Sequence, residues 1–463
     1  MNNPYRVVQI GKLEDGRTVW GGRTQRLSES GDQMKLYPHQ VEGLKKCKDR
    51  NRIALYWDMG LGKTFGGSEK MRELGARVNL VICQKSKIQD WTDHFEKYYS
   101  HVLRFDLTNK NGLEGFMHVF TLGIVCVGIV NYELAWRRPE LLNLHDFTLL
   151  LDESSLIQNR KAKQTKFVLK LQPANVILLS GTPTAGKYEN LWTQLRLLGW
   201  DISESAYNAQ FVNWKTQKIG WREPKIIRVV DKENPYKNVE RLKMKMREYG
   251  AQFLKTEECI ELPEQTFVEI NVSKPLKYSK FMKDSILEID GHELVGDTSL
   301  TKRLYARQLC GIYSEAKIEA FRNLLESTSD RIIVFYNFTA EMEALREVVK
   351  ELGRECSVVN GSTKDLRCYE EFDDSVTFVQ YQAGAMGLNL QKANKVIYFT
   401  LPERSELFEQ SKKRIHRMGQ KNACFYYVLM CKNTIEEDIY ATLKMRKDYT
   451  DELFRKGLAN REK

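Results

Sequence analysis

Short runs of apolar and β-branched residues recur along the chain in two separate blocks. In the first block they occupy residues 79–83, 124–130, 147–151 and 175–180, and in the second residues 331–335, 376–380, 395–399 and 424–430. The runs are continuous and do not alternate with polar residues, which is typical of strands buried on both faces of a parallel sheet. Segments with helical spacing lie between them, for example residues 85–99, 187–198 and 339–352. This alternation of strand and helix indicates βαβ units, so the pattern predicts an α/β fold with two parallel-sheet lobes in tandem.

A different kind of segment separates the two blocks. Residues 201–265 lack buried-strand runs, and residues 213–247 carry eleven Lys or Arg against four Asp or Glu, a net charge of +7 (11 − 4). We therefore expect a helical, basic insertion between the lobes, although a solvated helical surface explains any single charge in it equally well.

The two ends of the chain have their own patterns. Glycines and short apolar alternation in the first 35 residues predict a hairpin-like appendage, and Thr434 with Glu437 has capping-box spacing that predicts a helix running toward Arg455. The expected division is therefore an N-terminal appendage (1–35), a first lobe (36–200), the basic insertion (201–265), a second lobe with leading helices to about residue 325 (266–445) and the end of the C-terminal helix (446–463).

Length and composition agree with a folded protein of several domains. At 463 residues the chain has room for roughly three domain-sized units. The longest apolar stretch, residues 119–130, is too short and too broken by glycine to span a bilayer, and the first residues lack the apolar region of an export signal. We therefore expect a cytoplasmic protein without membrane contacts.

Charge and cysteine content exclude some classes and favour others. Lys and Arg number 72 against 61 Asp and Glu, a net charge of +11, which favours an acidic partner such as nucleic acid, although solubility also explains a moderate excess. The nine cysteines contain no Cys-x-x-Cys pair, which removes zinc ribbons and thioredoxin-like redox motifs.

The strongest local signal for chemistry follows the apolar residues 53–56. It reads Trp57-Asp58-Met59-Gly60-Leu61-Gly62-Lys63-Thr64. Glycines let successive backbone N–H groups turn toward phosphate oxygens, so Lys63 would reach the β- and γ-phosphates and the Thr64 hydroxyl would ligate Mg²⁺. Trp57 stands where the strict P-loop pattern has a glycine, and Gly-Lys-Thr also arises by chance, so this loop alone leaves function and coincidence equally open.

A second sequence pattern favours a phosphate-binding function over coincidence. The strand-like residues 147–151 end in Asp152 and Glu153, which places two carboxylates at the carboxyl edge of the sheet, where α/β proteins bind ligands. Asp152 would hold Mg²⁺, and Glu153 would polarise an attacking water. An ordinary acid pair at a strand end is the alternative, and the phosphate-binding loop upstream argues against it.

These segments together resemble those of the helicase-like ATPases of superfamily two, and within them the Swi/Snf-related group. Residues 36–43 resemble the family's adenine-reading segment, with Gln40 as the implied base contact. In the first lobe the similar segments are 58–64 (motif I), 80–86 with Trp91 (motif Ia), 130–133 (motif Ib), and 180–183 with 189–192 (motif III). In the second lobe they are 331–338 (motif IV), the loop 359–363, 382–390 (motif V) and 410–420 (motif VI).

The resemblance covers residues 36 to 445 and implies two RecA-like lobes that bind ATP and Mg²⁺ between them. Arg414 and Arg417 of motif VI are the implied arginine fingers on the γ-phosphate. Without the family pattern, both would be interpreted as part of an exposed basic helix, because Lys412 and Lys413 lie beside them.

Contacts to nucleic acid and coupling between the two sites are further implications of the resemblance. Coupling is expected from Ser180, Thr182, Gly387 and Asn389. The implied nucleic-acid contacts are Lys85, Ser86, Asn131, Tyr132, Asn337, Phe338, Gly361, Ser362, Gln382 and Gly384. Each of these residues singly also suits a cap or a turn, so the expectation concerns the set.

The chain departs from the family pattern at four places. Ser154-Ser155 follows the acid pair where the family usually has Ala-His, Thr400 stands where Asp is common, residues 403–405 replace Trp-Asn-Pro, and Ala385 replaces a frequent glycine. The first of these changes puts the link between hydrolysis and nucleic-acid movement in doubt.

The expected function is a nucleic-acid-dependent ATPase that translocates along double-stranded DNA. One alternative is a helicase that separates the strands of DNA or RNA, and another is an ATP-dependent clamp or scaffold with little turnover. We expect a monomer in the cytoplasm of a bacterial or phage-infected cell, with a nuclear location also open and with targeting left to a protein partner.

Overall fold

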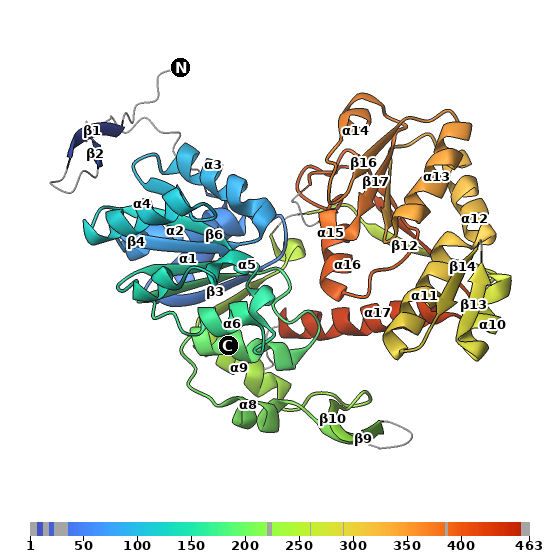
Figure 1. The fold of residues 1–463 in the computed structure, drawn as a ribbon, viewed down its shortest axis with the longest axis horizontal. Coiled ribbons are helices and arrows are strands. Elements are labelled where there is room, and N and C mark those ends of the chain that lie inside the picture. The colour runs from blue at the N-terminus through green and yellow to red at the C-terminus, as the bar shows by residue number, and fades with distance from the viewer. Residues whose placement is uncertain are drawn as a thin grey trace.

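Two lobes, each built around one parallel β-sheet, lie side by side in this computed structural model (Figure 1). It describes residues 7–12, 18–22, 36–219, 225–259, 261–289, 291–384 and 388–454. At the N-terminal end, β1 (Val7–Lys12) and β2 (Thr18–Gly22) pair antiparallel, which is the hairpin that the sequence predicts. No helix in the described part of the chain is both long and apolar enough to cross a bilayer.

The first lobe contains a seven-stranded sheet in the order β11-β3-β8-β7-β4-β6-β5. All of its neighbouring strands run parallel. The strands are β3 (Arg52–Trp57), β4 (Val78–Cys83), β5 (Leu103–Asp106), β6 (Cys126–Asn131), β7 (Thr148–Asp152), β8 (Asn175–Leu179) and β11 (Ala251–Leu254). Parallel strands place all their carboxyl ends at one edge, so the loops that follow β3, β7 and β8 share that edge.

Helices cover both faces of this sheet. They are α1 (Pro38–Lys46), α2 (Lys63–Leu74), α3 (Ile88–Tyr98), α4 (Lys110–Thr121), α5 (Tyr132–Ala135), α6 (Lys163–Val168) and α7 (Trp192–Leu197), with the 3₁₀ turns η1 (Lys85–Lys87), η2 (Pro139–Asn143), η3 (Ser154–Ile157) and η4 (Tyr188–Leu191).

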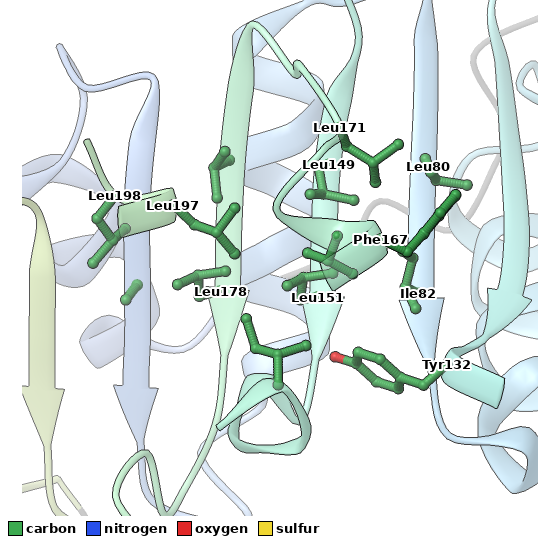
Figure 2. Close-up of a cluster of buried hydrophobic side chains, with 14 of the residues drawn as sticks. Leu80, Ile82, Tyr132, Leu149, Leu151, Phe167, Leu171, Leu178, Leu197 and Leu198 are labelled. Carbon is green, nitrogen blue, oxygen red and sulfur yellow. The ribbon is translucent and has the colours of Figure 1, made fainter. Parts of the chain in front are cut away.

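The hydrophobic core of this lobe has two layers because successive side chains of a strand point to opposite faces. Leu149 and Leu151 of β7 belong to one cluster, and Leu150 between them belongs to the other. Figure 2 shows Phe167 and Leu197 lying over the first of these faces, above the leucines of β7 and β8. Burying one such side chain contributes about 1.5–3 kcal/mol, so the two layers hold the functional loops on a rigid base.

The insertion between the lobes holds more than helices. It contains α8 (Glu204–Phe211), β9 (Trp214–Ile219), β10 (Lys225–Val230), α9 (Val239–Glu248) and η5 (Thr256–Glu258). β9 and β10 form an antiparallel hairpin, which projects away from the sheet with α8 at its base (Figure 1). The chain then returns to the first lobe, where β11 pairs with β3 at the edge of the sheet.

The second lobe contains a six-stranded parallel sheet in the order β12-β19-β18-β15-β17-β16. Its strands are β12 (Gln265–Val272), β15 (Ile332–Tyr336), β16 (Cys356–Val359), β17 (Val376–Gln380), β18 (Lys395–Tyr398) and β19 (Cys424–Cys431). The hairpin β13 (Ile286–Ile289) and β14 (His292–Val295) lies outside this sheet. The helices are α10 (Leu276–Asp284), α11 (Ser299–Ile312), α12 (Glu315–Glu326), α13 (Thr339–Glu351), α14 (Arg367–Glu371), α15 (Tyr381–Gly384), α16 (Ser405–Lys412) and α17 (Ile435–Phe454).

The predicted α/β class with two parallel-sheet lobes is confirmed. Each of the eight apolar runs forms a strand in the expected lobe. The C-terminal helix also begins where expected, and the Glu437 carboxylate accepts a hydrogen bond from the Asn433 N–H at 3.0 Å just before it.

Candidate active site between the two lobes

The loop between β3 and α2 has the shape of a phosphate-binding loop. Gly60 and Gly62 adopt the left-handed φ angles +87° and +71°, and a Cβ on Gly62 would overlap the Gln40 amide. The Lys63 ammonium donates hydrogen bonds to the carbonyl oxygens of Trp57 (3.0 Å) and Asp58 (3.2 Å). Burial lowers the pKa of Lys63, although three nearby carboxylates oppose the shift. The lysine is therefore held folded into the loop by weak acceptors that a phosphate oxygen can replace.

Gln40 of α1 fixes the same loop from outside. Its side chain is buried, its amide nitrogen donates to the carbonyls of Leu61 (3.2 Å) and Gly62 (3.3 Å), and its amide oxygen accepts from the Tyr37 N–H (2.8 Å). In this structure the Gln40 amide therefore holds the phosphate-binding loop.

The predicted acid pair lies at the carboxyl end of β7, facing Lys63. The Trp91 indole N–H donates to the Asp152 carboxylate at 2.9 Å, which fixes the side chain of that residue. Glu153 adopts a left-handed backbone (φ +54°) and its carboxylate accepts a hydrogen bond from the Ser180 hydroxyl at 3.4 Å. Burial raises the pKa of Glu153 to about 7; Lys63 opposes this rise, and Asp152 adds to it. A carboxyl group tuned close to neutral pH suits a general base.

The second lobe contributes arginines to the same space. The α16 helix ends at Lys412, so Arg414 and Arg417 lie on the turn that follows it and not on an exposed basic helix. The Arg414 side chain is 2% exposed, and among the described residues its Nε has no hydrogen-bond partner. Burial, and after it the neighbouring Arg417, lowers the pKa of Arg414 to about 10. A buried guanidinium with a free N–H group requires an anionic ligand, because leaving it unpaired is costly.

Both lobes line one cavity of about 460 Å³. It is bordered by the phosphate-binding loop, the acid pair, and the two arginines, together with Asn389 and Gln410 of the second lobe. Residues that sequence reasoning places together (Gln40, Met59, Gly60, Gly62, Lys63, Thr64, Asp152, Glu153, Arg414 and Arg417) all line it. Asp58 and Leu61 support the loop from behind, with Leu61 buried in the core.

One contact across the lobes was missed by sequence reasoning. The Lys413 ammonium donates to the Asp58 carboxylate at 2.5 Å, and the same carboxylate oxygen accepts from the Thr256 N–H (3.1 Å) and hydroxyl (3.2 Å). Burial alone would raise the pKa of Asp58, but Lys413 and the hydrogen bonds lower it. The ion pair therefore ties motif VI of the second lobe directly to the phosphate-binding loop of the first.

The predicted coupling residues Ser180 and Thr182 lie directly behind Glu153. The Ser180 hydroxyl, which donates to Glu153, also accepts from the Thr182 N–H at 3.1 Å. The unusual Ser154 is buried and donates to the Gln194 side chain (2.8 Å), which in turn donates to the Pro183 carbonyl (2.7 Å). Ser154 therefore connects the acid pair to the motif III loop. Gly387 lies outside the described residues, and Asn389 is exposed at the edge of the cavity.

The segment that replaces Trp-Asn-Pro lies against the first lobe. The Ser405 hydroxyl donates to the Ala185 carbonyl at 2.9 Å, and Gln158 donates to the Glu406 carboxylate at 2.7 Å. These contacts join motif III and the acid-pair loop to the second lobe.

The predicted nucleic-acid contacts divide into two groups. Five of them are exposed and lie shortly after the end of a strand: Lys85 and Ser86 in η1, Gly361 and Ser362 in the loop after β16, and Gln382 in α15. Asn337 is half-buried and donates to Thr400 (2.9 Å) and to the Leu401 carbonyl (3.0 Å), and Phe338 is half-buried beneath the Arg307 guanidinium. The exposure of Gly384 lies outside the described part of the structure.

Asn131 and Tyr132 need correction as nucleic-acid contacts. Both are buried, and the Tyr132 hydroxyl donates to the Asp152 carbonyl at 2.9 Å while the Asn131 amide donates to Glu133 at 2.6 Å. Tyr132 therefore supports the acid pair from the core, whereas Asn131 holds Glu133 in the turn after β6.

Two cations of the basic insertion are held within the fold. Lys243 of α9 is 2% exposed and pairs with Glu240 at 2.7 Å, and the Arg247 guanidinium lies over the Phe253 ring. The Arg247 contact with Phe253 of β11 packs α9 onto the first lobe.

A P-loop, paired carboxylates and facing arginines between two parallel α/β lobes define a two-lobed P-loop nucleotide-binding protein. The model of the SNF2-related domain matches residues 39–313, and that of the helicase conserved C-terminal domain matches residues 316–419. The chain belongs to the SNF2-related family, which confirms the resemblance drawn from its motifs.

Curated relatives come from animals, yeast and bacteria. The chain is 24% identical to the SWI/SNF-related matrix-associated actin-dependent regulator of chromatin subfamily A-like protein 1 homolog of Caenorhabditis elegans, over 89% of this chain and 61% of the relative. It is 22% identical to an uncharacterized ATP-dependent helicase of Mycoplasma genitalium, over 87% of this chain and 41% of the relative. The chain thus spans between about two fifths and three fifths of the length of these relatives.

One solved structure that the chain is similar to is the Sulfolobus solfataricus SWI2/SNF2 ATPase core in complex with dsDNA. It is 20% identical, covers 92% of this chain and 95% of its own, and superposes with a TM-score of 0.45.

Proposed function

We propose that this protein is a nucleic-acid-dependent ATPase that moves along double-stranded DNA. The observation that carries the proposal is the cavity in which Lys63 and the acid pair of one lobe face the buried Arg414 of the other, whose Nε has no hydrogen-bond partner in the described part of the chain. Membership of the SNF2-related family supports ATP as the nucleotide, and it supports duplex DNA as the track more than RNA.

The residues of the cavity suit ATP in distinct ways. Lys63 and the backbone N–H groups of the glycine loop would bind the phosphates. The Gln40 amide would exchange its hydrogen bonds to the loop carbonyls for contacts with the base. Thr64 and Asp152 offer the oxygen ligands that Mg²⁺ prefers. When bound there, Mg²⁺ would neutralise charge on the phosphates.

Hydrolysis would depend on lobe closure. Glu153 would orient the attacking water and accept its proton, because its carboxylate is tuned near neutral pH and held by Ser180. Arg414 and Arg417 would stabilise the charge of the transition state, and an arginine finger contributes about 10³ to 10⁵ in rate. Because these groups come from different lobes, each cycle of ATP binding and hydrolysis would close and reopen the cleft.

Exposed residues on loops of both lobes would contact the backbone of the DNA. Lys85 and Ser86 of the first lobe, and Gly361, Ser362 and Gln382 of the second, are available for this role. Such contacts are independent of sequence and weaken with salt. Targeting would need a protein partner, and a monomer in the bacterial or phage-infected cytoplasm stays our expectation.

The experiment that tests this function is ATPase stimulation by duplex DNA, single-stranded DNA and RNA at several salt concentrations. We expect duplex DNA to raise kcat the most and Glu153→Gln to abolish turnover while ATP binding is retained. Strand separation in an unwinding assay would favour the helicase alternative. ATP binding without turnover on any nucleic acid would favour the clamp, and wild-type turnover in Glu153→Gln would refute the role of Glu153.

A further inference from the structure

A second cavity of about 510 Å³ lies beside the ATP site and shares no lining residue with it. Its wall comes from the loop after the acid pair, from the motif III segment, from α8 and β9 of the insertion, and from Arg404 of the second lobe. Glu153 lines the first cavity and Ser155, two residues later, lines the second. The loops that follow β7, β8 and β18 bring both cavities to the carboxyl edges of the two sheets.

The charges around this second cavity favour an anion. Four cations (Arg160, Lys161, Lys187 and Arg404) and two carboxylates (Glu189 and Glu204) line it, a net charge of +2 (4 − 2). Arg160 pairs with Glu204, and Glu189 accepts a hydrogen bond from the Tyr236 hydroxyl at 2.9 Å. Within the described residues, Lys161 and Lys187 form no ion pair, and both are exposed. Two unpaired ammonium groups at the rim of a concave site suit a phosphate group.

The interior of the second cavity offers groups that suit a nucleobase. The Trp214 indole N–H and the Asn208 amide oxygen are both buried, and neither has a hydrogen-bond partner in the described part of the chain. An unpaired buried donor or acceptor costs about 1–3 kcal/mol, so a ligand that supplies both an acceptor and a donor is favoured. The Watson–Crick edge of every nucleobase carries such a pair, and an unpaired base exposes that edge. The Arg228 guanidinium lies over the Trp214 ring at 5.6 Å from its centroid, which leaves one ring face on which a base can stack.

We propose that the second cavity binds one unpaired nucleotide of the nucleic acid, with its phosphate at Lys161 and Lys187 and its base at Trp214 and Asn208. The inference rests on the proposed function and extends it, because it assigns a nucleotide site that is separate from the ATP site and from the exposed loops. The cavity also touches a link between the lobes. Gln158 in its wall donates to Glu406, and Arg404 in its wall pairs with the same carboxylate group at 2.5 Å.

This arrangement gives the nucleotide a route to the ATP site. An occupant whose phosphate attracts Arg404 would break the ion pair between Arg404 and Glu406. It would thereby change the hydrogen bond from Gln158 to Glu406, which is one of the contacts between the lobes. Occupancy of the second cavity would therefore alter lobe closure, and with it the rate of ATP hydrolysis.

The test compares Lys161→Ala/Lys187→Ala with the matched control Lys166→Ala/Lys170→Ala. The control removes the same charge from two exposed lysines that do not line the cavity. The probes are a labelled duplex, the same duplex with one unpaired nucleotide, a single strand, and adenosine 5′-monophosphate. Binding is measured by fluorescence anisotropy across a salt series, with basal ATPase as a check that the fold is intact.

We expect the cavity variant to bind the duplex with the unpaired nucleotide about tenfold more weakly and to lower the salt slope by one to two, as loss of two phosphate contacts requires. The control should stay within about twofold of wild type. Trp214→Phe keeps the ring but removes the N–H group, so it should reduce the preference for the unpaired nucleotide while leaving the salt slope unchanged.

Two outcomes would overturn this inference alone. The first is equal binding of the probes by the cavity variant and the control. The second is a cavity variant that loses binding of adenosine 5′-monophosphate but keeps its affinity for the duplexes and the single strand, which would assign the cavity to a free nucleotide. If the wild-type protein binds no nucleic acid and its ATPase responds to none, the proposed function fails together with this inference.

Discussion

At the scale of single residues, Glu153 shows how burial tunes the carboxyl group that we propose to activate water. Its carboxyl group lies beside Asp152 in the cavity between the lobes, and burial is the largest cause of its raised pKa of about 7. Lys63 and Arg414 oppose this shift with their positive charge. Burial therefore shifts this carboxyl group toward its neutral form.

The pH dependence of catalysis follows from this tuning. Only the ionised carboxylate can accept a proton from water, so kcat/KM for ATP should rise with pH through about 7, the value for the free enzyme. Because Glu153 and Asp152 interact, the observed midpoint belongs to the pair. Steady-state ATPase rates between pH 5.5 and 8.5 measure it. A wild-type profile that is flat across this range would contradict the assignment.

At the scale of elements, the turn between β3 and α2 depends on glycine for two separate reasons. Gly62 needs a left-handed backbone, and the Gln40 amide occupies the place where its Cβ would be. Gly75, at the other end of α2, has a similar φ of +66° but open space around it. Gly62 and Gly75, at the two ends of one helix, can therefore be compared. Substitution strains the backbone at both positions, but only at Gly62 would the new Cβ collide with another side chain.

We expect Gly62→Ala to weaken ATP binding at least tenfold. The new Cβ would strain the backbone and would also displace the Gln40 side chain from the phosphate-binding loop. Gly75→Ala shares the strain of about 1 kcal/mol in stability and should leave ATP affinity unchanged. Titration with a fluorescent ATP analogue, together with thermal unfolding, separates the two effects. Equal losses of affinity in both variants would show that strain alone matters.

Elements with a strong local signal could be predicted from the sequence, and elements defined by distant partners could not. The apolar runs that form β4, β7 and β15 carry their own pattern, and so does the glycine-lysine turn. The strands β9 and β10 carry lysine and arginine among their other residues and have no alternating pattern, so their charge suggested a helical surface. β11 joins the first sheet only because β3 offers its free edge, a contact across almost two hundred residues.

The same distinction applies within the candidate site. Lys63, Asp152, Glu153, Arg414 and Arg417 could be assigned because motif spacing identifies them. The burial of Tyr132 and the pairing of Lys413 could not be predicted, because each depends on an atom from another segment. Tyr132 needs the Asp152 carbonyl oxygen, and Lys413 needs the Asp58 carboxylate.

At the scale of the whole molecule, the Asp58–Lys413 ion pair holds the two lobes together at the edge of the ATP cavity. Each partner is less than a fifth exposed (16% for Asp58 and 17% for Lys413), and the distance between Nζ and Oδ2 is 2.5 Å. Removing one partner of a largely buried pair leaves the other charge uncompensated, which costs more than the pair itself contributes.

Lys413→Glu should therefore lower kcat/KM for ATP about tenfold, which corresponds to about 1.4 kcal/mol, and should widen the distance between lobes measured by fluorescence energy transfer. The exposed Lys421→Glu provides the control with the same change of charge. Restoring the pair in reverse, with Asp58→Lys and Lys413→Asp, should recover part of the lobe closure. No change in either readout for Lys413→Glu would mean that the pair does not hold the lobes.

The return of the chain to the first sheet through β11 has a mechanical consequence. The polypeptide that joins the lobes starts beside β3 and is fixed by Thr256 to Asp58 on the phosphate-binding loop, and His416 contacts the Pro263 carbonyl at 2.9 Å near its other end. The pivot of the second lobe therefore lies next to the nucleotide. Displacement in a rotating body grows with distance from its pivot, so a small movement at the terminal phosphate becomes a larger stroke at the outer loops of the lobes.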